Sequence, residues 1–225
     1  MTDDLRRGHR ERLRSRFLET DGKGVQDYEL LEMILFSANP RGDVKPLAKI
    51  LLKTFGSIQK VLLAPVSALQ AIPEMGPAAV ATITVTQELN RRILLQDILD
   101  KPVLNHWEKV VEYCEAQMRH LDLEQFRILF LDRKNNLIAD EIQQEGTLDQ
   151  TPIFPREVVK RALAHGAGAI ILVHNHPSGD PTPSQSDIQM TRQIIQATAP
   201  LEIRVHDHII VGRNRSQSLR QLGLI

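Results

Sequence analysis

The amino-acid sequence predicts an α+β protein in which a small all-helical domain (1–100) precedes a domain with a mixed sheet flanked by helices (103–225). Three observations support this prediction. Apolar residues recur at helical spacing through the first hundred residues, where no long alternating stretch occurs. Strand patterns begin only with "QFRILFLD" (125–132). Between the two regions, "LDKPVLN" (99–105) combines a proline with polar residues, which is typical of a linker.

The composition is that of a globular protein with enough apolar residues to form a core. Of 225 residues, 42% are hydrophobic and 25% are charged, and 28 basic residues balance 28 acidic ones. Net charge therefore predicts neither a nucleic acid nor a membrane as a partner. The single cysteine, Cys114, excludes a disulfide within the chain and fits a reducing compartment. Because we find neither a secretory signal nor an apolar run as long as a membrane span, we expect a cytoplasmic protein.

The first domain contains three segments with helical periodicity, 27–38, 44–55 and 77–99. Part of it, "LQAIPEMGPAAVATI" (69–83), has the shape of a helix-hairpin-helix, in which a tight glycine turn presents backbone N–H groups to a phosphate. Glu74 stands where the common pattern has glycine, and a carboxylate there should repel phosphate. We therefore expect weak or absent DNA binding. The alternative to a phosphate site is a helix pair packed for its own sake or for a contact with another protein.

Basic residues gather at the start of this domain. They are Arg6, Arg7, Arg10, Arg12, Arg14 and Arg16. These side chains could contact phosphate groups, but acidic residues are interspersed among them, so a solvated helix fits the pattern equally well.

The second domain alternates between strand and helix patterns. Strands are expected at 125–132, 137–146, 167–174 and 201–212, and helices at 110–118, 154–166 and 186–198. The first strand places Phe126, Ile128 and Phe130 on one face and Leu129 and Leu131 on the other. The third strand is apolar on both faces, so we expect it to be buried inside the sheet.

Two histidines stand one residue apart at the end of the third strand, in "LVHNHPSGDPTPSQSD" (172–187). Side chains at i and i+2 of a strand point to the same face, so His174 and His176 project together. Imidazole is a good zinc ligand, and Asp187 is a candidate third ligand if the loop folds back, which leaves a fourth position for water. The histidines can equally be exposed or hydrogen bonded without a metal. Ser184 and Asp187 also form the helix-start pattern S-x-x-D, with Ser184 as the N-cap.

The spacing of these four residues resembles the JAMM motif of the MPN/JAB metalloprotease fold. The flanking stretches "PREVVKRAL", "HNHPSGDPTPS" and "DHIIVG" resemble the bacterial RadC family in particular, over the whole second half and more loosely over the first. The resemblance implies a JAMM/MPN domain of cytidine-deaminase-like α/β architecture. It implies one zinc ion per chain, bound by His174, His176 and Asp187, and a Ser184 that assists the oxyanion of a tetrahedral intermediate.

The resemblance also implies a general base, a glutamate just before the first core strand. Glu124 matches it best, and Glu141 and Glu145 on the following strand are the alternatives. We then expect zinc-dependent hydrolysis of a peptide or isopeptide bond in an unidentified peptide or protein. The competing expectation is a DNA- or protein-binding adaptor whose zinc is structural or vestigial.

Two more histidines, His206 and His208, again stand at i and i+2. They could add metal ligands or support the existing ones. The alternative is a structural role in "DHIIV", with Asp207 bonded to neighbouring backbone.

Overall fold

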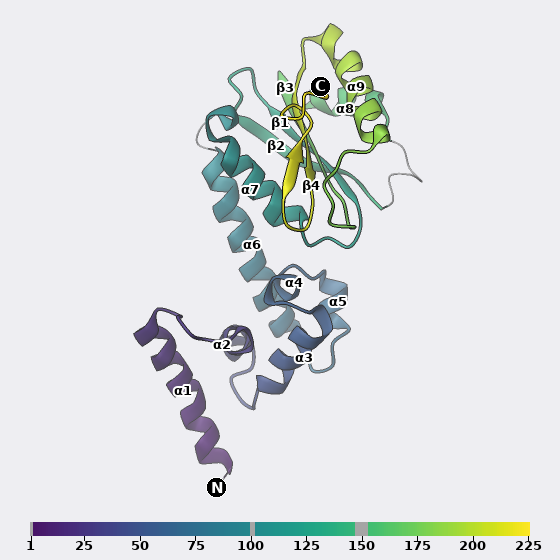
Figure 1. Cartoon of the computed structure of the whole chain (residues 1–225). Helices are drawn as coiled ribbons and strands as arrows, with labels where there is room; N and C mark the ends of the chain where they lie inside the picture. Colours follow the sequence, from purple (N-terminus) through teal and green to yellow (C-terminus); the bar gives the residue numbers. More distant parts are fainter. Residues whose placement is uncertain (1, 100–101, 147–152) are drawn as a thin grey trace. The chain divides into compact units, whose positions relative to one another are not determined.

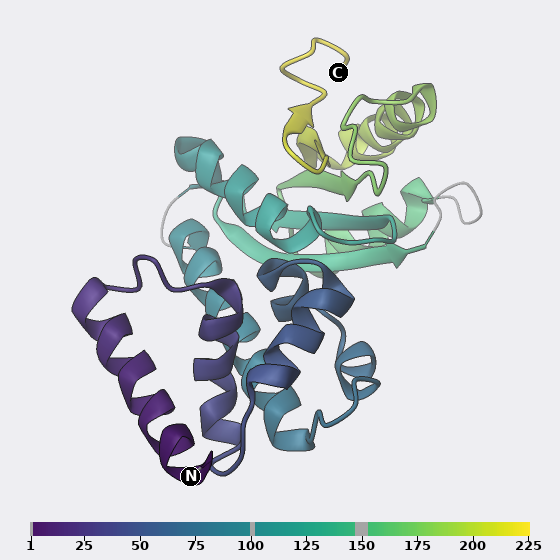
Figure 2. The same cartoon turned by 60° about the horizontal axis from the view of Figure 1, so that its bottom comes forward.

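The computed structural model of the chain describes residues 2–99, 102–146 and 153–225. The chain divides into two compact units, Met1–Asn90 and Arg91–Ile225, so that the division falls inside one helix, α6 (Pro77–Leu99). Figures 1 and 2 show the elements of the two units. Part of the predicted linker lies outside the described residues. Within the described part of the chain, no helix is both long and apolar enough to cross a bilayer.

The first unit is helical, as the sequence predicts. Its elements are α1 (Thr2–Thr20), α2 (Asp27–Ala38), α3 (Lys45–Phe55), α4 (Ile58–Leu62), α5 (Val66–Gln70) and the first part of α6. Gly56 ends α3 with a φ of 87°, a left-handed conformation that glycine adopts without steric cost. The next residue, Ser57, caps α4 by accepting a hydrogen bond from the backbone N–H of Lys60 at 3.2 Å. Helices α4 and α5 were not predicted, because five residues are too few to show a helical period.

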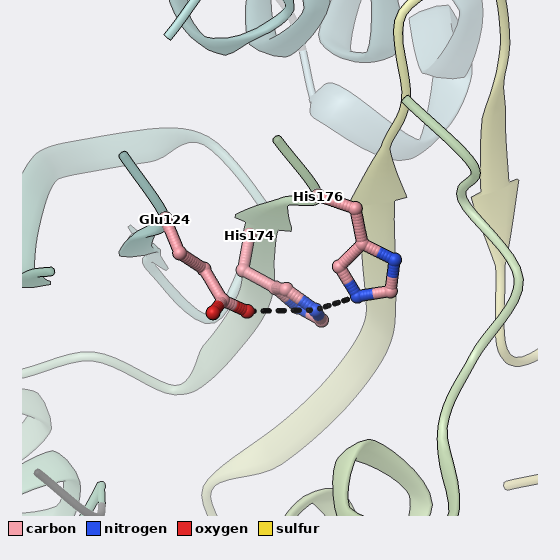
Figure 3. A group of neighbouring side chains, drawn as sticks. All are labelled: Glu124, His174 and His176. Carbon is pink, nitrogen blue, oxygen red and sulfur yellow. Dashed lines mark hydrogen bonds and ion pairs between the residues drawn. The ribbon is translucent and has the colours of Figure 1, made fainter. Parts of the chain in front are cut away.

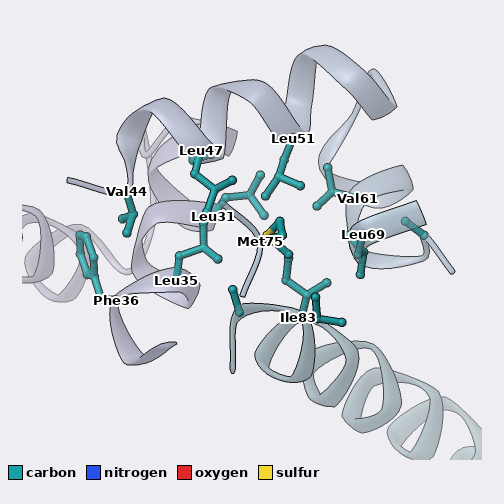
Figure 4. Packing of buried hydrophobic residues seen from close by; sticks show 14 of the residues in the cluster. Leu31, Leu35, Phe36, Val44, Leu47, Leu51, Val61, Leu69, Met75 and Ile83 are labelled. Carbon is teal, nitrogen blue, oxygen red and sulfur yellow. The ribbon is translucent and has the colours of Figure 1, made fainter. Parts of the chain in front are cut away.

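One apolar cluster holds the helices of the first unit together (Figure 4). Leu31 and Leu35 of α2, Leu51 of α3, Leu69 of α5 and Ile83 of α6 are all completely buried. Burying one side chain of this kind contributes about 1.5–3 kcal/mol relative to leaving it in water. The unit therefore has a core of its own.

Arginines of α1 attach that helix to α2. Arg10 donates a hydrogen bond to the backbone carbonyl of Asn39, at the end of α2, at 2.7 Å. Arg16 forms an ion pair with the buried Glu29 at 2.5 Å. These two residues are therefore engaged within the unit and are not simply solvated. The side chains of residues 2–7 lie outside the described part of the chain.

The second unit is built on a mixed five-stranded sheet, in agreement with the predicted α/β architecture. Its elements, after the end of α6, are η1 (Val103–His106), α7 (Trp107–Met118), β1 (Gln125–Leu131), β2 (Leu137–Glu145), α8 (Pro155–Ala164), β3 (Ala169–Asn175), α9 (Gln185–Thr198), η2 (Ala199–Leu201), β4 (Arg204–Val211) and β5 (Ser216–Ser218). The strand order is β2-β1-β3-β4-β5, and only β3 and β4 run parallel. The short polar strand β5 was not predicted, because "SQS" has no apolar alternation.

Helices cover both faces of this sheet, which explains why every residue of β1 and β3 is buried. On one face α7 and the end of α6 pack over Leu129 and Val173. On the other face α8 and α9 pack over Phe126 and Leu172. The predicted division of the β1 side chains between the two faces is therefore confirmed, and Figure 1 shows α7 on one side of the sheet and α8 and α9 on the other. The central strand β3 is consequently packed on both faces up to the end that carries the histidine pair.

Strand β4 contains an irregularity that affects the site. After Val205 its register against β3 shifts by one residue, so that β4 has one extra residue, His206, at this point. The extra residue reverses the alternation of the side chains that follow it. His208 therefore faces α9, where it contacts Thr191, and the i, i+2 relation of the two β4 histidines does not place them together.

Candidate metal centre

The H-x-H pair lies at the end of the central strand β3, with the two Nε2 atoms 2.9 Å apart (Figure 3). His174 belongs to β3, which is paired with β1 on one side and β4 on the other, and its side chain is completely buried. His176 follows the strand, and its backbone N–H continues the ladder by donating to the carbonyl of Val211 at 2.9 Å. The structure thus brings the two side chains together, as their spacing predicts.

The carboxylate of Asp187 faces both histidines. Its Oδ1 lies 3.4 Å from Nε2 of His174, and its Oδ2 lies 3.6 Å from Nε2 of His176. Ser184 is the N-cap of α9: its Oγ accepts from the Asp187 backbone N–H at 3.1 Å, and its own N–H donates to Asp187 Oδ2 at 2.7 Å. The helix-start interpretation of S-x-x-D is confirmed, and this capping box is what orients the Asp187 carboxylate.

The hydroxyl of Ser184 is engaged with its neighbours. It donates a hydrogen bond to Oδ2 of Asp187 at 2.6 Å, and it lies 2.8 Å from the hydroxyl oxygen of Ser186. Ser184 is therefore next to the candidate ligands, but its proton points to Asp187. To stabilise an oxyanion, the hydroxyl has to turn out of this hydrogen bond.

Of the three glutamates considered as base, Glu124 is the one that joins the histidines. Its carboxylate and the two imidazoles form a group of possible ligand atoms, all within 4.8 Å of one another, and its Oε1 lies 3.9 Å from Nε2 of His174. Glu141 instead bonds to Arg161 at 2.8 Å, and this guanidinium, together with His165, lowers the pKa of Glu141 to about 2. Glu145 ends β2 and is exposed.

Asn175, between the two histidines, fixes the segment that carries Glu124. Its Oδ1 accepts a hydrogen bond from the backbone N–H of Gln125 at 2.8 Å, and its Nδ2 donates to the carbonyl of Leu123 at 3.0 Å. The carbonyl of Glu124 itself accepts from the N–H of Gly146 at 2.8 Å. Asn175 is 1% exposed, so water does not compete for these bonds. The sequence contains one signal for this role, the position of Asn175 directly between the two histidines.

Both histidines of the pair have their Nδ1 atoms engaged on the side away from the site. Nδ1 of His176 lies 2.7 Å from the backbone carbonyl oxygen of Asp180, which can only accept, so His176 carries a proton on Nδ1. Nδ1 of His174 lies 2.7 Å from Nε2 of His208, whose Nδ1 lies 2.6 Å from the hydroxyl oxygen of Thr191 on α9. His208 thus supports a candidate ligand. Asp207 has the structural role considered in the sequence analysis, because it accepts hydrogen bonds from the backbone N–H groups of His208 and Arg220.

The electrostatics of the site favour a cation among these groups. Burial lowers the pKa of His174 to about 4 and that of His208 well below its ordinary value, so both are uncharged near neutral pH. The facing Asp187 carboxylate raises the pKa of His176. Burial opposes ionisation of Asp187, but contacts with His176, His174 and Ser184 hold its pKa well below the usual range. The site therefore combines an ionised carboxylate with an uncharged imidazole, and the carboxylate favours a positive charge beside His176.

These donors fit a divalent metal ion such as zinc. Zinc binds imidazole nitrogen and carboxylate oxygen at about 2.0–2.2 Å with tetrahedral geometry, which places ligand atoms about 3.3–3.5 Å apart. The separations among His174, His176 and Asp187 are 2.9, 3.4 and 3.6 Å, close to that spacing. In addition, two imidazole lone pairs at 2.9 Å repel each other unless a proton or a metal ion lies between them.

A family model described as RadC-like JAB domain matches residues 104–224. The match covers more than half of the chain, from η1 almost to the end of the second unit. It includes the whole sheet and all five candidate site residues. The chain therefore belongs to the RadC-like JAB domain family.

Proposed function

We propose that the protein is a zinc-dependent hydrolase that cleaves a peptide or isopeptide bond, with zinc held by His174, His176 and Asp187. One observation carries the proposal. Three donor groups converge within 3.6 Å, while a further carboxylate, that of Glu124, lies beside them directly before the start of β1. A purely structural metal site needs no such additional carboxylate.

Each side chain has a defined part in this reaction. Bound zinc would polarise the scissile carbonyl and lower the pKa of a water toward neutrality. Glu124 accepts the proton of the attacking water and passes it to the leaving nitrogen. Asn175 holds the backbone on both sides of Glu124, so the carboxylate approaches from a constant direction. Ser184 keeps Asp187 oriented, and its hydroxyl stabilises the oxyanion after turning from Asp187.

A second function, a metal-stabilised binding module, is favoured by one observation. The Ser184 hydroxyl, which a hydrolase of this type needs for the oxyanion, is committed to Asp187. In such a module the same residues would hold the metal, but no peptide would be cleaved.

Substitution of Glu124 separates the two functions. We expect Glu124→Gln to keep the zinc content of the unaltered protein and to lower kcat by about 10²–10⁴-fold, because glutamine cannot accept the proton. The measurement is cleavage of a library of peptides and isopeptide-linked peptides, together with metal analysis. Glu145→Gln, an exposed position at the end of β2, is the matched control and should leave both unchanged.

Two results would contradict the hydrolase proposal. One is normal turnover by Glu124→Gln. The other is a zinc-loaded protein that cleaves no member of the library, which would favour the binding module.

A further inference from the structure

The proton of the Thr191 hydroxyl has a defined acceptor. Oγ1 of Thr191 lies 2.6 Å from the backbone carbonyl oxygen of Asp187, one turn earlier in α9. A carbonyl oxygen only accepts, so at this distance the hydroxyl donates to it, as threonine in a helix often does with the carbonyl four residues before. The lone pairs of the hydroxyl are then left for its other neighbour, Nδ1 of His208 at 2.6 Å.

The direction of this hydrogen bond determines the direction of the next two, from His208 to Thr191 and from His174 to His208. Nδ1 of His208 faces an acceptor and therefore carries a proton. The His208 ring is completely buried between two uncharged groups, so it is neutral and its Nε2 offers a lone pair. That lone pair accepts from Nδ1 of His174 at 2.7 Å. His174 is consequently protonated on Nδ1, and its Nε2 presents a lone pair to His176 and Asp187.

We propose that Thr191 and His208 are positioning residues that set the tautomer of His174 and so make it a metal ligand. The inference rests on the metal site of the proposed function, but not on hydrolysis. If every hydrogen bond ran the other way, each proton would sit on the opposite nitrogen, and His174 would turn an N–H to the site. An N–H cannot bind a metal ion. A ligand histidine usually has a carboxylate, a carbonyl or a water in this supporting place, whereas here the support is a second imidazole.

Two features of the fold make this chain of hydrogen bonds possible. The extra residue in β4, His206, turns His208 toward α9 and β3. The first two turns of α9 carry Asp187 and, four residues later, Thr191, so one helix end supplies a candidate ligand and fixes the tautomer of another. Thr191, His208 and His174 are completely buried, so water does not offer them alternative hydrogen-bond partners.

The first test uses the unaltered protein, freed of metal and labelled with ¹⁵N. Nitrogen chemical shifts distinguish a protonated from a bare ring nitrogen, and we expect Nδ1–H on both His174 and His208 near neutral pH. A proton on Nε2 and none on Nδ1 of His174 would overturn the proposal. Because this measurement needs neither substrate nor metal, its outcome is separate from that of the hydrolysis experiments.

The second test removes the hydroxyl. Thr191→Val keeps the shape of the side chain, and we expect it to shift His174 toward the Nε2–H tautomer and to lower zinc affinity by roughly 10–100-fold, measured by competition with a chromophoric chelator. Thr191→Ser should restore both properties. Thr198→Val is the matched control, since Thr198 is buried on the same helix and donates to the Ile195 carbonyl at 3.2 Å.

The proposal fails if a folded Thr191→Val protein has the zinc affinity and His174 tautomer of the unaltered one, or if Thr198→Val lowers zinc affinity as much as Thr191→Val. If Thr191→Val does not fold, the ¹⁵N measurement of the His174 and His208 tautomers in the unaltered protein decides whether the proposal holds.

Discussion

Asp187 has two roles, as a candidate metal ligand and as part of the cap of α9. Its carboxylate faces both histidines, and its backbone and Oδ2 close the capping box with Ser184. We expect Asp187→Ala to lower zinc affinity at least about 100-fold, because even partners that only support a ligand account for 10–100-fold. Metal analysis after dialysis against a weak chelator measures this loss.

The matched control for that experiment is Asp180→Ala. The Asp180 carboxylate bonds to Thr182, while only its backbone carbonyl contacts His176, so zinc binding should be kept. Full zinc occupancy in a His174→Ala, Asp187→Ala double variant would show that the metal binds elsewhere.

Substitution of Ser184 can separate an effect on stability from an effect on catalysis. We expect Ser184→Ala to lower the free energy of unfolding by about 1 kcal/mol, because the cap of α9 is lost. We also expect kcat to fall by roughly 10²–10³-fold, the effect of losing one oxyanion donor, with zinc still bound. Denaturant unfolding and peptide cleavage by the same preparation measure both quantities. A variant whose kcat is unchanged would leave Ser184 as a cap alone.

The Ser184 hydrogen bonds also decide which second variant is informative. An aspartate at this position would preserve the capping function, but its carboxylate would face Oδ2 of Asp187 and repel it. Ser184→Thr, which retains a hydroxyl, is therefore the appropriate restoration variant and should recover both stability and kcat.

At the residue scale, the sequence could predict candidate ligands but not the side chains behind them. His174, His176 and Asp187 follow a spacing in one continuous stretch, so a pattern along the chain suffices to find them. His208 reaches the site through a β-bulge, which leaves no periodic signal in the sequence. Thr191 lies on a predicted helix, but the helical period does not show which strand residue it contacts. The i, i+2 spacing of the β4 histidines does not show that His208 contacts His174 whereas His206 contacts Asn135.

At the scale of secondary-structure elements, Glu141 links strand β2 to helix α8. Its carboxylate bonds to Arg161 and His165, and these partners lower its pKa from the ordinary 4.5 to about 2. Because the pKa in the folded state lies below that in the unfolded state, the link stabilises the protein fully above about pH 4.5. This contribution is lost as the pH falls toward 2.

Substitution of Glu141 should show this pH dependence. We expect Glu141→Gln to lower the free energy of unfolding at pH 6 and the difference from the unaltered protein to shrink below pH 4.5. Urea unfolding at several pH values measures it, with the exposed Glu145→Gln as control. A difference that is independent of pH between 6 and 3 would mean that the Glu141 charge has no role in this link.

Elements with many apolar residues could be predicted well, and short polar ones could not. Helices α2 and α6 and strands β1 and β3 lie where the apolar period places them. Helices α4 and α5 and strand β5 have three to five residues, and they form because neighbouring elements supply their partners. Tertiary contacts of this kind are absent from any local pattern.

At the scale of the whole molecule, the two units have separate cores, and the family match lies in the second. The function of the first unit is therefore a proposal of its own. Its turn between α5 and α6 contains Glu74 with a φ of 69°, the left-handed conformation that glycine prefers. We propose that this turn binds duplex DNA weakly or not at all, because the carboxylate repels phosphate.

Glycine at this position tests the proposal. Relief of the left-handed strain is offset by the greater freedom of glycine in the unfolded chain, so we expect Glu74→Gly to change the free energy of unfolding by less than about 1 kcal/mol. If the turn is a disabled phosphate site, the variant should bind duplex more tightly, with an affinity that falls as salt rises. Tight binding by the unaltered protein that survives changes at this turn would instead point to the arginines of α1.

The hydrogen bonds of Asn175 determine how the proposed catalytic site can fail. His174, Asn175 and His176 are consecutive, so the candidate metal ligands and the residue that fixes the Glu124 segment share one short piece of backbone. Any distortion of this strand end displaces metal and base together. On heating, zinc release and loss of turnover should therefore coincide at one temperature, without a population that retains zinc but has lost its base.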